Sequence, residues 1–347
     1  MISVKNLVKK YDNITALDDL SVEINDNEIF GLVGPNGAGK TTLIHILATL
    51  IKPTSGTAVV NGYDITRSPS KVRSSIGIVF QAPSSDDMLT GYENLKLHSF
   101  LYSVPSNIRE ERISEVLDLV GLTDRKEHQV KKYSGGMRRR LEIARGLLHK
   151  PDVIFLDEPT LGLDPRSREI MWKYIERLVR EEKISIILTT HYMDEADFLC
   201  DRIGIIDKGR IIALDTPSEL KANLGGDIIK VVPTINDGTS SETTTLLKGK
   251  NYYGIVEEIL RKFDFVKNVK MDDHEKETLV IYVKNARQNL PTILRELDNN
   301  GIKVSSVDFK SPTLNDVFLK YAGRDITTID DHAEGGFVER YAQYGKK

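Results

Sequence analysis

Apolar residues along this chain gather in short blocks whose spacing switches between the strand period and the helix period. The block Ile29–Val33 is apolar apart from one glycine, which predicts a buried strand. After a glycine-rich loop at 34–39, apolar residues return at helical spacing as Leu43, Ile44 and Leu47. This stretch therefore predicts a strand, a tight loop and a helix in direct succession.

Similar blocks predict the other elements of the first two thirds of the chain. Strands are expected at 2–7, 20–24, 57–60, 76–80, 153–158, 184–190, 203–206 and 210–213. The turn residues Asn25–Asn27 predict an antiparallel hairpin between the strand at 20–24 and the strand ending at Val33. Helices are expected at 92–103, 108–120, 135–149, 167–181, 193–200 and 217–224. The helices between about 90 and 150 predict a helical subdomain inserted between two strands.

Gly225 and Gly226 mark a predicted boundary, beyond which the pattern is strand, helix, strand, strand, helix, strand. These elements are expected at 228–232, 255–263, 266–270, 278–284, 291–299 and 303–309. This order is typical of a ferredoxin-like α+β domain. A last helix is expected at 314–321, and the polar residues from 324 onward predict a loosely held tail. The predicted domains are 1–222 and 225–323, with a flexible tail at 324–347.

Composition narrows the class of protein. The length of 347 residues suggests about two domains. The net charge of −3 means that the chain lacks the excess of positive charge that is typical of nucleic-acid-binding proteins. The single cysteine, Cys200, excludes a disulfide framework and fits a reducing compartment. No apolar run approaches the roughly 20 residues that span a bilayer, and no signal-peptide pattern opens the chain. We therefore expect a soluble protein whose membrane role, if any, depends on a partner.

The loop after the strand ending at Val33 carries a strong chemical signal. Its sequence GPNGAGKT matches the pattern G-x-x-x-x-G-K-[ST] and stands between a strand and a helix, as that pattern requires. Glycines let successive backbone N–H groups surround an anion, and the helix N-terminus adds its positive dipole end. Lys40 is expected to reach the β- and γ-phosphates, and the Thr41 hydroxyl to hold Mg²⁺. The residues expected to bind the nucleotide phosphates are Gly34, Pro35, Asn36, Gly37, Ala38, Gly39, Lys40, Thr41 and Thr42.

Two adjacent acids, Asp157 and Glu158, end the apolar strand expected at 153–158. Acids in this position are costly unless they are engaged. With the phosphate loop upstream, Asp157 is expected to be the Mg²⁺-side carboxylate, and Glu158 to accept a proton from the attacking water. An ordinary glutamate is already ionised at neutral pH, so this base needs no unusual tuning. The alternative is that both acids cap the following turn.

Two other polar side chains also follow predicted strands directly, His191 after 184–190 and Gln81 after 76–80. Because the carboxyl ends of parallel strands open on one crevice, we expect both residues near Asp157. His191 is expected to contact the γ-phosphate and position the water, and Gln81 to join the metal shell and report on the γ-phosphate. Tyr11, expected in the loop after the first strand, either stacks on the adenine ring or packs on the sheet.

A second glycine-rich helix start, Ser134–Gly136, offers a serine N-cap and two bare backbone N–H groups, so it is a second candidate anion site. One nucleotide cannot easily be wrapped by both sites within one chain. We therefore expect Ser134, Gly135 and Gly136 to face ATP held by a second copy. Arg138–Arg140 follow, and we interpret them as a solvated face with no assigned role.

Together these motifs resemble the ATP-binding subunits of ABC transporters over residues 1 to about 222. The matching segments, in family order, are Gly34–Thr41, Gln81, Tyr133–Met137, Val153–Glu158, Leu161–Asp164 and His191. The resemblance implies an α/β P-loop ATPase with an antiparallel β subdomain and an inserted helical subdomain, and it adds Asp164 and Tyr11 to the nucleotide contacts. Tyr133 and Met137 stand where the family usually has leucine and glutamine, and Met137 cannot make the hydrogen bonds of a glutamine amide. This form, together with the segment Leu314–Phe318, resembles the drug-resistance and lipid exporter subfamily.

The resemblance implies an ATPase that works as a homodimer around two Mg²⁺–ATP and drives a separate membrane permease. The permease would be contacted around Gln81 and 86–93, at the inner face of the cell membrane, with the ATPase in the cytoplasm. Export of drugs, lipids or other hydrophobic compounds rests on the subfamily resemblance. The transported substrate is not readable from this chain.

Two rival interpretations remain from the sequence. A soluble ABC ATPase of the translation or DNA-repair kind would carry tandem ATPase units or long coiled coils, and neither pattern is present. A small-molecule P-loop kinase would give Ser134–Gly136 no purpose. The domain at 225–323 shows no metal or catalytic spacing, so it could provide a second dimer contact, a regulatory ligand site, or both.

Overall fold

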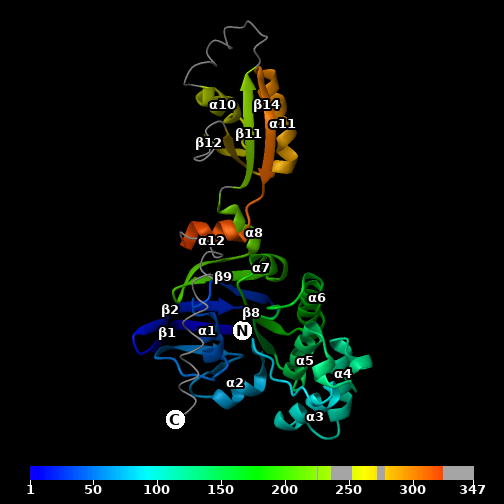
Figure 1. Ribbon diagram of the computed structural model, residues 1–347. Helices are drawn as coiled ribbons and strands as arrows, with labels where there is room; N and C mark the ends of the chain where they lie inside the picture. The colour runs from blue at the N-terminus through cyan, green and yellow to red at the C-terminus, as the bar shows by residue number, and fades with distance from the viewer. Residues whose placement is uncertain (225, 236–251, 272–277, 323–347) are drawn as a thin grey trace. The chain divides into compact units, whose positions relative to one another are not determined.

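The computed structural model describes residues 1–224, 226–235, 252–271 and 278–322 (Figure 1). These residues form two compact units, Met1–Pro217 with Tyr321 and Ala322, and Ser218–Lys320. The predicted tail at 324–347 and the polar loop at 236–251 lie outside the described residues. No helix in the described ranges is both long and apolar enough to span a bilayer.

The first unit is built on a six-stranded sheet with the order β10-β9-β3-β8-β7-β6. Its strands are β3 (Ile29–Val33), β6 (Ile76–Val79), β7 (Val153–Asp157), β8 (Ser185–Thr190), β9 (Arg202–Asp207) and β10 (Arg210–Asp215). All neighbours pair in parallel except β10, which is antiparallel to β9 at the edge. Every residue of β3, β7 and β8 is buried, as expected for parallel strands covered on both faces. The carboxyl ends of five strands therefore open on one edge of the sheet.

A second, antiparallel sheet has the order β2-β1-β4-β5 and consists of β1 (Ile2–Tyr11), β2 (Ile14–Ile24), β4 (Ser55–Val60) and β5 (Tyr63–Asp64). The predicted hairpin across Asn25–Asn27 is wrong, because β2 pairs with β1. The residues at 25–27 lead instead from one sheet to the other, and both sides of β3 are occupied by β8 and β9. The sequence identified the strands and the turn, but not the partner of each strand.

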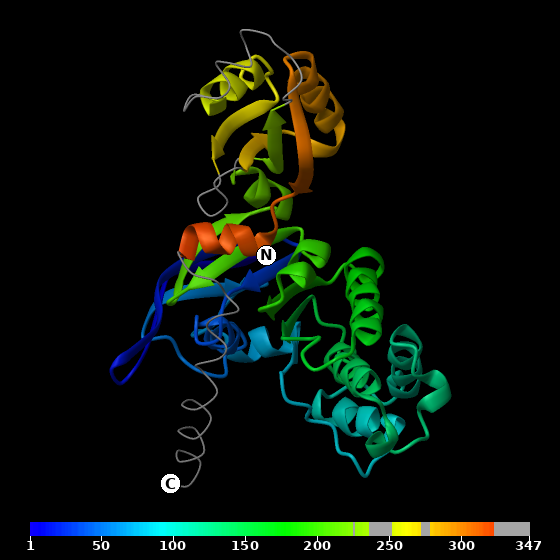
Figure 2. The same cartoon turned by 45° about the horizontal axis from the view of Figure 1, so that its top comes forward.

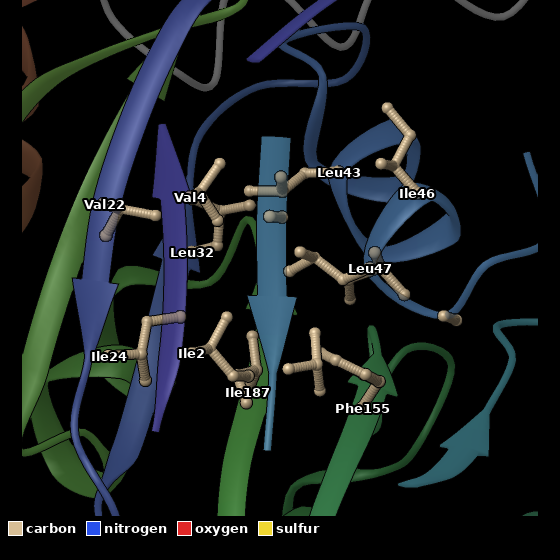
Figure 3. Close-up of a cluster of buried hydrophobic side chains, with 14 of the residues drawn as sticks. Ile2, Val4, Val22, Ile24, Leu32, Leu43, Ile46, Leu47, Phe155 and Ile187 are labelled. Carbon is tan, nitrogen blue, oxygen red and sulfur yellow. The ribbon is translucent and has the colours of Figure 1, made fainter. Parts of the chain in front are cut away.

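A shared hydrophobic core lies between the two sheets and helix α1 (Lys40–Leu47) (Figure 3). Ile2 and Val22 enter it from the antiparallel sheet, and Leu47 enters it from α1. Phe155 and Ile187 complete it from β7 and β8. Because this core holds α1 against the sheet, it fixes the helix start that follows the glycine-rich loop.

The other helices of this unit are α2 (Pro69–Ser75), α3 (Gly91–Leu101), α4 (Arg109–Leu119), α5 (Gly135–Leu147), α6 (Pro165–Glu182) and α7 (Met193–Leu199), with short 3₁₀ turns η1 (Thr123–Arg125) and η2 (Val130–Lys132). Helices α3, α4 and α5 form a block inserted between β6 and β7, as predicted, and α5 packs on β6 (Figure 2). Thr90 and Glu93 form the capping box that begins α3.

The second unit contains β11 (Asp227–Ile235), α10 (Tyr252–Leu260), β12 (Val266–Met271), β13 (Leu279–Val283), α11 (Ala286–Asn299) and β14 (Ile302–Lys310). Helices α8 (Pro217–Ala222) and α12 (Leu314–Ala322) lie before and after them in the chain. The sheet order is β12-β13-β11-β14 with antiparallel neighbours throughout. The predicted ferredoxin-like arrangement is therefore confirmed.

Helix α11 begins five residues earlier than predicted, at Ala286 rather than Pro291. Proline usually stands in the first turn of a helix, so the sequence pattern placed the start at Pro291. In the structure, the Asp227 carboxylate accepts a hydrogen bond from the Ala286 N–H at 2.7 Å, which caps the earlier start. Because Asp227 lies on β11, far from α11 in the sequence, the residues around the helix start do not reveal this cap.

The half-buried His98 on α3 should make this protein sensitive to mild acid. Burial, followed by the nearby charge of Arg145, lowers the pKa of His98 from 6.5 to about 4. Between these two values the unfolded chain binds a proton that the folded chain does not, so the free energy of unfolding should fall as the pH drops through that window. His98→Gln should remove about 1–2 kcal/mol of this loss, measured by urea unfolding at neutral pH and near pH 5.

His128→Gln is the matched control, because it removes an exposed histidine from the same unit. An equal acid dependence in wild type and His98→Gln would contradict the prediction.

Candidate functional site

The glycine-rich loop between β3 and α1 has a backbone path that larger residues could not follow. Gly39, which caps α1, has φ of 110°, a conformation that residues with a Cβ rarely adopt. A Cβ on Gly34 would lie 2.2 Å from the carbonyl oxygen of Ile206 on β9. The Ala38 N–H donates to the Pro35 carbonyl at 3.2 Å, which closes the turn. The loop therefore has the tight geometry of an anion cradle at a helix N-terminus.

Lys40 is buried, with 5% of its surface exposed, and begins α1. Its Nζ donates to the carbonyl oxygens of Gly34 at 2.6 Å and Pro35 at 3.1 Å. The same ammonium lies 3.8 Å from Oε1 of Glu158. The structure thus brings together two residues that lie 118 positions apart in the sequence (158 − 40).

Asp157 is 2% exposed at the end of β7. Its Oδ1 accepts hydrogen bonds from Oγ1 of Thr189 at 2.5 Å and from Oγ1 of Thr41 at 3.3 Å. The first bond crosses from β7 to the neighbouring β8, and the second reaches the phosphate loop. The sequence analysis did not identify Thr189 as a site residue. The two threonines that end the largely apolar strand β8 were a signal that could have indicated it.

Glu158 and His191 meet at the carboxyl ends of two adjacent strands. His191 Nδ1 lies 3.3 Å from Oε1 of Glu158. The Glu158 backbone has φ of 47°, which is uncommon for a residue with a side chain. Its N–H donates to Oγ1 of Thr189 at 3.0 Å and is also close to the Thr189 carbonyl at 3.2 Å. These bonds hold the backbone in a conformation that costs about 1 kcal/mol.

Opposing effects act on the pKa of the Glu158 carboxyl. Burial alone would raise this pKa, but the hydrogen bond from His191 and the charge of Lys40 outweigh burial and bring the pKa below its ordinary value. Glu158 therefore stays ionised at neutral pH. An ionised carboxylate beside an imidazole and an ammonium can accept a proton from a water molecule.

Arg139 contradicts the prediction of a solvated arginine face at 138–140. It is 7% exposed, and its guanidinium donates to three backbone carbonyls. Nε donates to Pro159 at 2.9 Å, Nη1 to Phe80 at 2.5 Å, and Nη2 to Asp157 at 2.7 Å. A run of three arginines does not show which one points inward, because that depends on how α5 packs against β6.

Gln81 and Tyr11 lie differently from the predictions. Strand β6 ends at Val79, so Gln81 follows it by two residues and is exposed. Among the residues described, no hydrogen bond joins the Gln81 side chain to Thr41 or Asp157. Tyr11 is the last residue of β1 rather than part of a loop, and it is half-buried with Nζ of Lys9 4.7 Å from its ring centroid.

The second glycine-rich helix start is exposed at Ser134 and Gly135. Ser134 caps α5 by accepting a hydrogen bond from the Met137 N–H at 3.3 Å. Asp164 caps α6 by accepting one from the Ser167 N–H at 3.0 Å. Within the described ranges, no hydrogen bond or ion pair links Ser134–Gly136 to the phosphate loop of the same chain.

The fold and the site define the protein class. A parallel sheet, a glycine-rich loop that leads into a buried lysine, and an aspartate paired with the loop threonine are the parts of a P-loop nucleoside triphosphatase. No group of three or more His, Cys, Asp or Glu side chains in the described residues could hold a metal alone. The chemistry that this arrangement supports is attack on a phosphate by water.

Comparison with known proteins identifies the family. The family model described as ABC transporter matches residues 17–161, and the model described as ATP-binding protein DrrA1-3-like, C-terminal domain matches residues 216–322. The daunorubicin/doxorubicin resistance ATP-binding protein DrrA of Streptomyces peucetius is 39% identical over 336 residues, which is 96% of each chain. The linearmycin resistance ATP-binding protein LnrL of Bacillus subtilis is 35% identical over 94% of this chain and 99% of its own.

Solved structures of ABC transporter ATP-binding proteins also resemble this chain. The protein cbiO1 of Clostridium perfringens, described as part of the ABC transporter complex cbiONQ, has a TM-score of 0.60 and 30% identity over 64% of this chain and 91% of its own. The ATP-binding cassette MJ0796, in a dimeric post-hydrolysis state bound to ADP and Pi, has a TM-score of 0.57 and 29% identity over 62% of this chain and 98% of its own. The chain belongs to the ABC transporter ATP-binding proteins and is an ABC-type ATPase. The predictions of family, fold class and enzymatic class are confirmed.

Thr189→Val should test how much the site depends on the bond between Thr189 and Asp157. Valine keeps the shape but leaves a buried carboxylate and the Glu158 N–H with fewer partners. We expect the free energy of unfolding to fall by about 1–3 kcal/mol, measured by chemical denaturation. Thr189→Ser keeps the hydroxyl and should lose less. Equal stability of wild type and Thr189→Val would show that the bond contributes little.

Proposed function

We propose that two copies of this chain close on two ATP molecules and use hydrolysis to drive a separate membrane permease. The observation that carries the proposal is the meeting of Lys40, Glu158 and His191 at the carboxyl ends of three adjacent strands. Each of these residues comes from a different part of the chain. A purely structural role would not require an ammonium, a carboxylate and an imidazole at one crevice.

The phosphate loop, residues 34–42, holds the nucleotide phosphates, with Lys40 on the β- and γ-phosphates. The Thr41 hydroxyl and the Asp157 carboxylate hold Mg²⁺, together with Gln81 once its exposed side chain has turned toward the site. Oxygen donors of this kind suit Mg²⁺, and the two side chains already lie 3.3 Å apart. When bound, Mg²⁺ offsets the charge of the phosphates. Tyr11 stacks on the adenine ring from the end of β1.

Glu158 accepts the proton of the attacking water, and His191 holds that water and the γ-phosphate in line. The lowered pKa of Glu158 supports the role of a base that is ready at neutral pH. Lys40 offsets the charge that moves onto the leaving oxygen. The ion pair between Lys40 and Glu158 supports a common location for both tasks.

The second copy of the chain completes each ATP site with its own Ser134–Gly136 and Asp164. Two observations support this: Ser134 and Gly135 are exposed, and within the described residues they make no hydrogen bond or ion pair with the phosphate loop of their own chain. The dimeric state of MJ0796 bound to ADP and Pi supports the same assembly. Loss of the γ-phosphate would then remove the ligand that the two chains share.

Export of a hydrophobic compound is the transport role that the relatives favour. DrrA is named for daunorubicin and doxorubicin resistance and LnrL for linearmycin resistance. A third relative, from Cupriavidus metallidurans, is a Nod factor export ATP-binding protein, 34% identical over 94% of this chain. This chain would work in the cytoplasm, at the inner face of the membrane. A soluble, non-transport ATPase is not favoured by any of these relatives.

Glu158→Gln should stop turnover while leaving ATP binding intact. Glutamine keeps the size of the side chain but cannot accept the proton, so kcat should fall by at least about 100-fold. A dimer should then persist with ATP and Mg²⁺, as measured by size-exclusion chromatography with light scattering. Lys40→Ala provides the contrast, because it should lose nucleotide binding as well as turnover. Hydrolysis by Glu158→Gln at the wild-type rate would rule out this base.

The exposed apolar side chains around α3 should dock the permease. Met88, Phe100 and Leu101 are 62%, 54% and 68% exposed. Met88 lies within the segment 86–93 that the sequence indicated, and the other two end α3. Met88→Ser with Leu101→Ser should lower co-purification with the permease by about tenfold, since central apolar anchors dominate interfaces. Leu50→Ser is the matched control, being 49% exposed elsewhere on the unit. Unchanged co-purification would exclude this surface.

A further inference from the structure

Helix α5 carries a row of buried charged side chains that the roles proposed above do not use. Arg139, Glu142 and Arg145 are 7%, 5% and 8% exposed. They recur every three residues, which places them on one face of the helix. Charged groups are rarely buried unless they are paired, so this face must bind specific partners.

The partners of Arg139 are backbone carbonyls on both sides of Glu158. Nη2 donates to Asp157 at 2.7 Å, and Nε donates to Pro159 at 2.9 Å. Because the Asp157–Glu158 and Pro159–Thr160 peptides on either side are both held, the guanidinium restricts the direction in which the Glu158 carboxylate leaves the chain. That direction matters because Glu158 has the uncommon φ of 47°.

The third partner of Arg139 is the carbonyl of Phe80, the residue before Gln81. Farther along the same loop, Glu142 accepts hydrogen bonds from the N–H groups of Ser84 at 3.1 Å and Ser85 at 2.8 Å. Arg145 donates to Glu142 at 2.7 Å and to Oγ of Ser84 at 3.0 Å. The loop that contains Gln81 is therefore bound to α5 at both of its ends.

We propose that Arg139 is a positioning residue for ATP hydrolysis, which joins the start of α5, the Gln81 loop and the Asp157–Pro159 segment into one body. This inference rests on the function proposed above. A displacement of the Gln81 loop would then be transmitted through Arg139 to Glu158 and to the start of α5 at Ser134. The planar guanidinium spreads its donors over three carbonyls, whereas a lysine offers all its donors from one point.

The neighbouring arginines show that this task is specific to Arg139. Arg138 forms an ion pair with the exposed Asp87. Arg140 donates to the carbonyl of Val120 at 3.1 Å and to the Tyr174 hydroxyl at 3.3 Å. Arg140→Gln is therefore a matched control, because it removes the same charge from the same helix without touching the site.

The test is steady-state ATPase kinetics of the full chain carrying Arg139→Gln or Arg139→Lys. We expect kcat to fall on the order of 100-fold, because small displacements of reacting groups cost about that much. The KM for Mg²⁺–ATP should stay within about threefold, since the phosphate loop is untouched. Arg140→Gln should keep the wild-type kcat. Added guanidinium ion should partly restore kcat in Arg139→Ala, which a general loss of folding would not allow.

A wild-type kcat in both Arg139 variants would overturn the inference. So would a joint loss of thermal stability and nucleotide affinity in both variants, with no rescue of Arg139→Ala by guanidinium, because this would show a role in folding alone. If Glu158→Gln also hydrolyses ATP at the wild-type rate, the proposed function itself fails. The Glu158 and Arg139 variants, measured side by side, therefore distinguish the two failures.

Discussion

The site depends on the parallel pairing that places β8 between β3 and β7. The hydrogen-bonded ladder fixes the register of all three strands, so their carboxyl ends stop at the same level. The phosphate loop leaves from β3, the two acids from β7 and His191 from β8. Without this order, the Lys40 ammonium could not lie 3.8 Å from the Glu158 carboxylate.

The same arrangement explains how so many charged groups are tolerated in the interior. Lys40, Asp157 and Arg139 are each less than a tenth exposed, and each has partners within hydrogen-bond distance. Lys40 and Arg139 bind backbone carbonyls at the ends of strands, where the ladder leaves oxygen atoms unpaired. Burial is therefore offset by bonds that also give each group its direction, and a site built this way needs little rearrangement.

The sequence alone predicted those features that depend on a short local pattern of residues. The glycine-rich loop between β3 and α1, the acids at the end of β7 and the serine cap of α5 each follow from a short pattern with its own physical reason. It failed where the answer depended on a distant partner. Thr189 was missed because its role is defined by Asp157 on another strand, and α11 begins early because Asp227 caps it. The strand at 20–24 was paired with its neighbour in sequence, although its hydrogen bonds go to β1.

The sequence by itself determined the fold class, the family and the location of the phosphate loop, because glycine spacing and apolar periodicity act over a few residues. Only the tertiary structure decided which strands lie side by side and which of three consecutive arginines is buried. It also showed that Gln81 is exposed and that, among the described residues, its side chain makes no hydrogen bond to Thr41 or Asp157. The physical reason is that strand pairing and helix packing are settled by contacts between segments far apart in the chain, and a local pattern carries no record of those contacts.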